Sequence, residues 1–170
     1  SMVGLSAETV KGLEADVLRL AGETAQAPKE LADAMFFITS AGLRGADAIE
    51  ALEVSAKAAA IGMGEAESIA DAVTNAINGY GSANIPAAQA ADVLAKTVEQ
   101  GKASAADLAP QFGRLIPMAA ELGISFDQVG GALAFLTRTS GNASESTSAL
   151  SGVMRALVKP TEKAKGIFEE

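Results

Sequence analysis

The chain has 170 residues and a net charge of −8, and 49% of its residues are hydrophobic while only 4% are aromatic. This length suits one folded domain, and the negative charge argues against binding a nucleic-acid backbone, which requires clustered Lys and Arg. Because Cys and His are both absent, disulfides, thiolate metal sites and most catalytic designs that work near neutral pH are excluded.

Apolar periodicity and capping residues predict eight helices along the chain. In the first, the stripe from Val10 to Leu20 is typical of an amphipathic surface helix. Pro28 suits the first turn of the second helix. The predicted helices cover residues 6–26, 28–41, 45–60, 65–80, 86–100, 104–122, 125–138 and 144–159.

The third and fourth helices carry specific side-chain expectations. In the third, Glu53 and Lys57 are spaced for an ion pair between residues i and i+4. The fourth has an apolar stripe from Ile69 to Tyr80, and its opposite face is polar. The polar residues expected to face away from the core are Asp71, Thr74, Asn75 and Asn78.

The second half of the chain has clear boundary signals. Ser125 and Gln128 fit the capping box that begins a helix, and Ser104 with Asp107 resembles it, although Glu or Gln usually takes the second place. Two prolines, Pro110 and Pro117, are expected to bend or split the sixth helix near residues 112–122. The eighth helix has a stripe from Leu150 to Leu157 and should end before Pro160.

Six glycines recur at intervals of 18 to 22 residues. Glycine readily adopts the left-handed conformation that closes a helix, and this interval holds about four helical turns plus a connection. Two interpretations stay open. The chain contains a true structural repeat, or it shows only the pattern that any series of short helices closed by glycine would show. The six positions are Gly42, Gly62, Gly81, Gly101, Gly123 and Gly141.

Composition and spacing together predict an all-α fold. Ala occupies 37 positions and has the highest helix propensity, whereas strand formers are scarce. We expect Ala-rich antiparallel helical hairpins, with about 20 residues per helix unit, that form a compact multi-helix bundle or a short solenoid. Residues 1–27 are expected to form a loosely packed N-terminal helix, and residues 28–170 a helical core domain.

No targeting or membrane-spanning segment is predicted. Residues 2–13 lack a basic start followed by an apolar run, so they do not resemble a secretory signal. The longest stretch without charge, residues 72–91, contains Asn, Gly and Pro, which argues against a transmembrane helix.

Several patterns were weighed as sites of chemistry. Gly101-Lys102 lacks the other residues of a phosphate-binding loop. The hydroxyls between Ser144 and Ser151 have no His and no evident Lys to activate them, so we expect Ser on the solvent face of a helix start. Asn142-Ala143-Ser144 fits the glycosylation pattern, which matters only in a secreted eukaryotic chain.

Two acidic pairs have a simpler explanation than catalysis. Asp47 with Glu50, and Glu65 with Glu67, lie in first helical turns, where they complement the helix dipole. We therefore predict no catalytic residue, no cofactor-binding residue, no cofactor, no metal site and no enzyme activity.

Charge and aromatic clusters suggest possible contacts. Residues 1–85 carry 12 acids and 5 bases, whereas residues 86–170 carry 9 acids and 8 bases. A basic cluster near the end could meet an acidic partner or an anionic lipid surface, although solvated helix-end charges explain it more simply. Its members are Arg155, Lys159, Lys163 and Lys165. Three aromatic residues could line a pocket, but core packing is the expected role of Phe112, Phe126 and Phe135.

An ordered series of short phrases runs from about residue 30 to residue 170. Among them are Ala41-Gly42-Leu43, residues 72–80, Glu121-Leu122-Gly123-Ile124-Ser125, Gly130-Gly131-Ala132-Leu133 and Leu157-Val158-Lys159-Pro160-Thr161. This series resembles the core region of phage tail tape measure proteins, the phage minor tail protein family.

The resemblance implies a virion structural protein of a phage or prophage that occupies the tail tube during assembly and sets tail length. It implies partnership with other phage tail proteins and self-association, a place in the virion tail after synthesis in the bacterial host cytoplasm, and no catalytic residues. Family members usually continue with another Leu-Gly unit, so residues 166–170 are expected to be cut within a helix and the core domain truncated at its C-terminus.

The ruler role of such proteins is attributed to long helical stretches, and 170 residues in one helix would span about 255 Å. The glycines and prolines forbid one unbroken helix, so we expect a folded head or anchor domain that supplies contacts. Two alternatives stay open: an α-helical repeat adaptor that binds a peptide in a groove, and a lipid-associating helical protein.

Overall fold

The computed structural model describes residues 7–158, with the side chains of residues 11–158, and within this range it contains eight helices and no strand. The prediction of an all-α fold is confirmed. The helices are α1 (Ala7–Thr24), α2 (Pro28–Ser40), α3 (Gly45–Ala60), α4 (Ala66–Tyr80), α5 (Ala87–Gln100), α6 (Ala105–Glu121), α7 (Phe126–Ser140) and α8 (Ala143–Val158).

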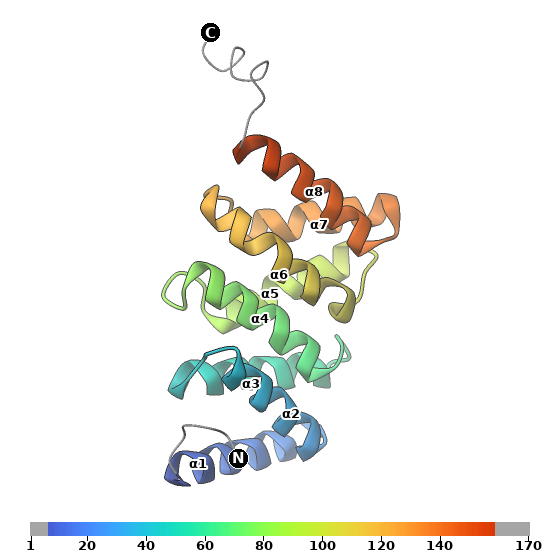
Figure 1. The fold of residues 1–170 in the computed structure, drawn as a ribbon. Coiled ribbons are helices and arrows are strands. Elements are labelled where there is room, and N and C mark those ends of the chain that lie inside the picture. The colour runs from blue at the N-terminus through green and yellow to red at the C-terminus, as the bar shows by residue number, and fades with distance from the viewer. Residues whose placement is uncertain (1–6, 159–170) are drawn as a thin grey trace.

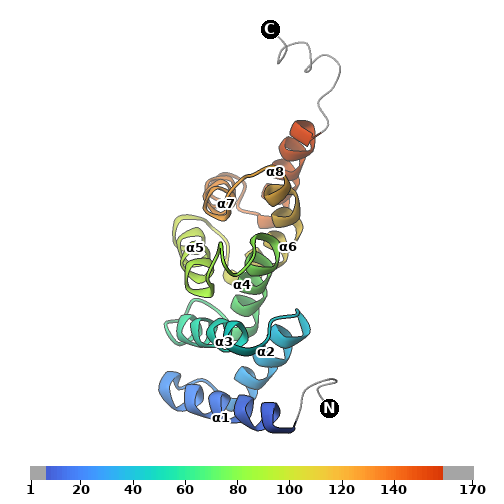
Figure 2. The ribbon, with the colours of Figure 1, turned by 90° about the vertical axis from the view of Figure 1, so that its left-hand side faces the viewer.

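The helices stack in two layers along one axis (Figure 1). Each helix makes its main contacts with the next helix along the chain and with the one after that. As a result α1, α3, α5 and α7 form one layer and α2, α4, α6 and α8 form the other (Figure 2). The predicted helical bundle therefore takes the form of a short solenoid, with α1 and α8 at opposite ends.

Small side chains let these helices approach closely. Among residues 11–158, Ala supplies 18 of the 40 buried hydrophobic residues, so the core depends on backbone proximity more than on large side chains. Helices α4 and α6 show this close contact, because a Cβ added at Gly79 would lie 2.0 Å from Cγ2 of Ile116. Only glycine fits this position without movement of the isoleucine.

Most of the regularly spaced glycines close helices as predicted. Gly42, Gly62, Gly81, Gly123 and Gly141 all have positive φ. At Gly42, Gly62 and Gly123 the glycine N–H and the next N–H return to carbonyl groups of the last helical turn in the same pattern, the Schellman motif.

Gly101 departs from this rule, because its backbone is extended, with φ −95° and ψ −164°. Its small size is needed for a different reason. A Cβ at this position would lie 2.7 Å from both Oγ1 of Thr137 and the carbonyl oxygen of Thr97. The glycine therefore permits contact between the end of α5 and α7.

Both predicted capping boxes are present. Ser104 accepts a hydrogen bond from the Asp107 N–H and donates its hydroxyl and its own N–H to the Asp107 carboxylate. The hydroxyl bond first, and then the N–H bond, lowers the pKa of that carboxyl. Ser125 and Gln128 form the same reciprocal pair at the start of α7. Asp thus replaces the usual Glu or Gln in the first of these boxes.

The prolines were expected to bend or split the sixth helix, and the expectation of a split is wrong. Pro110 and Pro117 both lie inside the continuous helix α6. Both prolines are exposed, so water can reach this side of the helix, while the opposite face buries Phe112 and Leu115. Burial of that face outweighs the two backbone hydrogen bonds that the prolines cannot donate.

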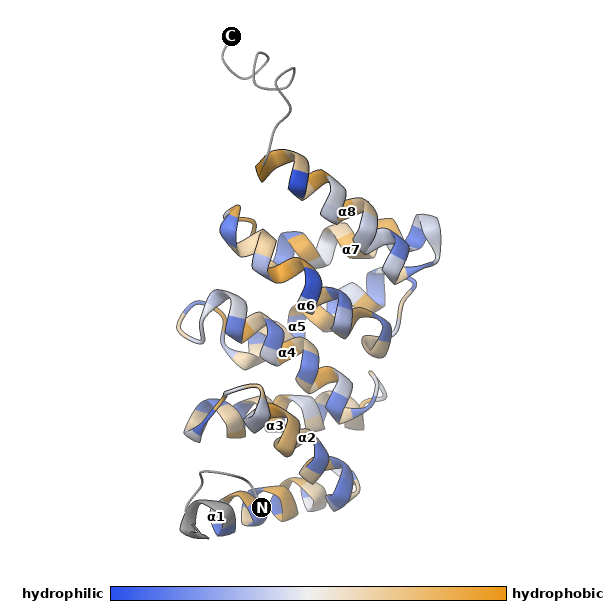
Figure 3. Ribbon diagram, viewed as in Figure 1, coloured by the Kyte–Doolittle hydropathy of each residue, from blue (hydrophilic) through white to orange (hydrophobic). Residues whose placement is uncertain are grey.

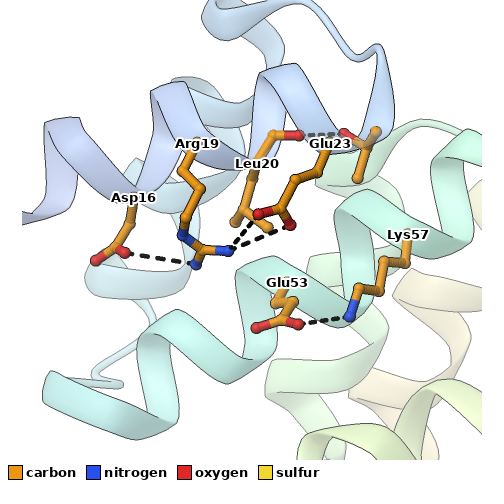
Figure 4. A network of polar contacts seen from close by, with 7 residues as sticks. Asp16, Arg19, Leu20, Glu23, Glu53 and Lys57 are labelled. Atoms are coloured by element: carbon orange, nitrogen blue, oxygen red, sulfur yellow. Dashed lines mark hydrogen bonds and ion pairs between the residues drawn. The ribbon is translucent and has the colours of Figure 1, made fainter.

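At the first end of the stack, α1 packs on α2 and α3 and buries Leu13, Val17 and Leu20. Figure 4 shows the polar surface of this region, where Arg19 of α1 pairs with Asp16 and Glu23 at 3.5 and 3.1 Å. The predicted ion pair of Glu53 and Lys57 forms on α3. Exposed pairs of this kind each contribute well under about 1 kcal/mol, so burial of the apolar stripe holds α1 in place.

Candidate functional site

The acidic pairs noted in the sequence lie on the surface. Asp47 and Glu50 are exposed in the first turns of α3, and Glu65 and Glu67 are exposed at the start of α4. Across the described part of the chain, no group of three or more acidic side chains is arranged to hold a metal ion. Their positions fit the interaction with the helix dipole that the sequence indicates.

The hydroxyl run of α8 is less exposed than expected. Ser144 and Ser148 are exposed, but Ser146, Thr147 and Ser151 are buried, because α8 packs on both α6 and α7 and presents small side chains to them. The Ser146 hydroxyl donates to the carbonyl of Asn142 at 2.8 Å, and Oγ1 of the buried Thr147 has no hydrogen-bond partner.

Two of the three phenylalanines are core residues, as predicted. Phe112 and Phe126 meet edge to face with ring centroids 4.8 Å apart, and Tyr80 lies against Phe126 at 6.2 Å. Phe135 is different: it is 67% exposed on α7, so its assignment to the core is wrong. Its position lies outside the α7 face that contacts α5 and α8.

Tyr80 links the end of α4 to the turn between α6 and α7. Its hydroxyl donates to the Ile124 carbonyl at 2.8 Å, across 44 residues of sequence. Burial raises the pKa of this hydroxyl to about 12, so it stays protonated and keeps its role as a donor at physiological pH. The hydrogen-bond partner of this hydroxyl is a backbone carbonyl, so the contact joins two parts of the fold.

The polar face predicted for α4 is partly buried. Thr74 is buried, and Asp71 and Asn75 are half-buried, because α4 packs against α2, α3, α5 and α6. Asn75 donates to Asp71 at 2.9 Å, and the exposed Asn78 donates to the Ala41 carbonyl at 2.9 Å. Burial raises the pKa of Asp71, against the opposing effect of the Asn75 hydrogen bond.

Hollows at four places lie between the described helices. One of about 350 Å³ lies between α4 and α6 and is lined by Asn75, Asn78 and Gly113 among others. Two smaller ones, of about 210 and 230 Å³, lie between α5 and α7 and between α1 and α3. The fourth, about 370 Å³, is a largely apolar groove between α1 and α2. Each is a gap between packed helices.

Glycines inside helices are the residues that sequence reasoning missed. Gly79 and Gly113 bring α4 and α6 together, and Gly130 would place a Cβ 2.6 Å from Oγ1 of Thr97 on α5. A signal existed, because glycine within a helical pattern costs about 1 kcal/mol relative to Ala and so indicates a packing role.

The basic cluster is only partly described. Arg155 lies exposed in the last turns of α8, and the other three members, Lys159, Lys163 and Lys165, lie outside the described residues, as do Pro160 and residues 166–170. None of the described helices is long and apolar enough to cross a bilayer.

Comparisons with known proteins place this arrangement in a family. Residues 14–170 match the family described as phage-related minor tail protein. The chain is also 23% identical over 162 residues to a tape measure protein of Pneumococcus phage Dp-1, which covers 95% of the chain and 14% of that relative's length. No solved structure matches significantly. An all-α stack whose surfaces serve contact, together with a family match over nearly the whole chain, leads to one assignment: the chain belongs to the phage-related minor tail protein family.

Proposed function

We propose that this chain is a folded domain of a phage tail tape measure protein, a virion structural part that supplies contacts during tail assembly. The observation that carries the proposal is the family match over residues 14–170, and the tape measure relative supports it. The chain spans only 14% of that relative's length, so this role concerns one region of a larger protein.

The dimensions of the helices favour a role in making contacts over a role in setting tail length. A single helix of 170 residues would span about 255 Å. The longest helix among the described residues has 18 residues, equivalent to about 27 Å, and each helix folds back on its neighbours. A stack of this kind contributes a broad surface while adding little to the reach of the chain.

The partners that follow from this role are other tail proteins and further copies of the chain, in the virion tail after synthesis in the host cytoplasm. The proposed role needs no catalysis. Family membership favours it over a peptide-binding adaptor or a lipid-associating protein.

The test uses a phage whose tape measure gene encodes this chain. Deletion of the coding region for residues 7–158 is expected to block tail assembly, seen by electron microscopy of lysates. A proportionate shortening of tails, by about 228 Å for the 152 deleted residues, would instead show that these residues act as a ruler.

A variant that keeps the length of the chain but disturbs its packing separates the contact role from the ruler role further. Gly79→Leu places a large side chain against Ile116 and is expected to reduce the number of assembled tails, whereas Gly152→Ala, at a glycine with open space around it, is expected to leave assembly normal. Normal tails with Gly79→Leu, after circular dichroism shows that the purified variant is unfolded, would contradict the proposal.

A further inference from the structure

The hollow between α4 and α6 brings polar and apolar groups together. It has a volume of about 350 Å³, and its lining combines the amide side chains of Asn75 and Asn78 on α4 with Ile116 and Pro117 on α6. Figure 3 shows both helices on the visible side of the stack, with hydrophilic and hydrophobic residues interspersed. Asn78 and Pro117 are exposed and Asn75 is half-buried, so a group from another molecule can reach the hollow.

Both amide side chains of this hollow keep their oxygen atoms available. The Asn75 amide nitrogen donates to the Asp71 carboxylate, and the Asn78 amide nitrogen donates to the Ala41 carbonyl, each at 2.9 Å. These bonds hold the side chains in place through their nitrogens. The Oδ1 atoms of both residues are left as hydrogen-bond acceptors for a ligand.

Pro117 provides a third acceptor. A residue inside a helix donates its N–H to the carbonyl four residues earlier, and proline has no N–H to donate. The carbonyl that loses its helical donor is that of Gly113, and Gly113 and Pro117 both line the hollow. Since glycine has no side chain, nothing of its own covers this carbonyl.

A carboxylate that lacks a cationic partner lies beside these acceptors. Asp71 is half-buried, accepts the hydrogen bond from Asn75, and takes part in none of the ion pairs of the described residues. Burial foremost, together with the negative charge of Glu67, raises the pKa of this carboxyl against the effect of the Asn75 hydrogen bond. Helix α4 contains no Lys or Arg, so a cation bound here would meet attraction without competition from its own helix.

We propose that the hollow between α4 and α6 binds an arginine side chain of a partner protein. A guanidinium group carries a positive charge and five N–H donors but no acceptor, which matches a site whose available polar atoms are oxygens. Its methylene stem would pack on Ile116 and Pro117. A lysine fits less well, because its ammonium group is a compact point charge that cannot spread its donors over several oxygens. The proposal concerns this surface and does not rest on a role in the tail.

NMR titration of the isotope-labelled 170-residue chain tests the proposal. The probe is a blocked five-residue peptide with one arginine between serine and glycine residues. Saturable shifts are expected in the side-chain amide signals of Asn75 and Asn78 and in the backbone signals of Gly79 and Gly113, which line the hollow. A matched peptide with citrulline, which has nearly the same shape but no charge, is expected to bind about tenfold more weakly.

Two substitutions with matched controls locate the binding groups. Asp71→Asn is expected to weaken binding of the arginine peptide about tenfold, whereas Glu99→Gln, which removes an acid from an exposed position on α5, is expected to leave it unchanged. Pro117→Ala restores an N–H that competes for the Gly113 carbonyl, so it should weaken binding without loss of helix content. Pro110→Ala, an exposed proline of the same helix outside the hollow, should bind like the unchanged chain.

Three results would overturn the proposal. The first is the absence of saturable shifts at Asn75 and Asn78 at millimolar peptide concentrations. The second is equal binding of the arginine and citrulline peptides, which would show that the hollow recognises a peptide backbone and not a guanidinium group. The third is equal weakening by Glu99→Gln and Asp71→Asn, which would assign the binding to the net charge of the chain.

Discussion

Individual glycines decide how closely the helices of this stack approach. Gly79 and Gly152 both lie inside helices, yet an added Cβ would meet Ile116 at the first and open space at the second. The same residue type is therefore required by packing at one position and only lowers helix propensity at the other. This contrast allows a test in which one substitution has opposite effects.

Gly79→Ala is expected to lower the free energy of unfolding by about 1–3 kcal/mol, because overpacking outweighs the gain in helix propensity. Gly152→Ala is expected to raise it by about 0.5–1 kcal/mol. Urea unfolding followed by circular dichroism measures both. In an Ile116→Ala background the cost of Gly79→Ala should disappear, and a cost that persists would show that the clash with Ile116 is not its cause.

Asp71 is expected to make stability depend on pH. Burial raises the pKa of its carboxyl in the folded chain, so the folded state holds the proton more tightly than the unfolded state. The stabilising effect of the protonated form is full below the unfolded pKa, near 3.9, and is lost as pH rises through the folded pKa. Relative to Asp71→Asn, the unchanged chain should therefore lose stability across this range in urea unfolding.

Two neighbours of Asp71 provide controls with opposite signs. Asn75→Ala removes a hydrogen bond that lowers the pKa of Asp71, so the pH dependence should grow, whereas Glu67→Gln removes a nearby negative charge and should reduce it. Parallel stability curves for the unchanged chain and Asp71→Asn at every pH would contradict this assignment.

At the scale of elements, the helices are defined by their ends. Pro28 begins α2, capping boxes begin α6 and α7, and glycines with positive φ close most of the helices. Helix α6 also tolerates two interior prolines because packing on α4, α7 and α8 holds it in place. The loss of stability that each proline causes should be measurable by substitution, because both prolines are exposed and their replacement does not disturb the core.

Pro117→Ala is expected to stabilise the chain by about 1–3 kcal/mol, because Ala restores an N–H inside the helix and has a much higher helix propensity. Part of the gain is offset by the larger conformational freedom of the unfolded chain. Pro28→Ala is the matched control, since Pro28 occupies a first turn that needs no N–H donor, and it should give no gain. If Pro117→Ala lowers the melting temperature, α6 needs the geometry that the proline imposes.

At the scale of the whole molecule, stability should follow the nearest-neighbour character of a stack. Each helix depends on the helices one and two places away, so the removal of an end helix affects its neighbours more than the far end. The division of the chain into residues 1–27 and a core of residues 28–170, proposed from the sequence, can be tested through this property.

Deletion of residues 1–27 is expected to leave a folded, cooperatively unfolding core with a lower melting temperature. The reason for the loss is that Leu13, Val17 and Leu20 no longer cover α2 and α3. Circular dichroism and thermal unfolding measure it. A shortened chain that unfolds without cooperativity would show that α1 is an integral part of the core.

Local sequence rules account for most of the elements. Propensity and capping act within a few residues, so Ser125 with Gln128, Gly42 and Gly141 indicate helix ends without knowledge of the fold. The same reasoning failed for Pro110 and Pro117, where contacts made by the rest of the helix decide the outcome. It also assigned a left-handed cap to Gly101, whose extended backbone reflects contact with Thr137 on a distant helix.

The sequence by itself determined that the chain is all-α, where its helices begin and end, and that Phe112 and Phe126 belong to the core, because these properties depend on nearby residues and on hydrophobicity. Only the tertiary structure decided the two-layer stack, the burial of Thr74 and the exposure of Phe135. The physical reason is that a helix with several apolar or small faces can pack in several ways, and the choice among them depends on which other helices surround it.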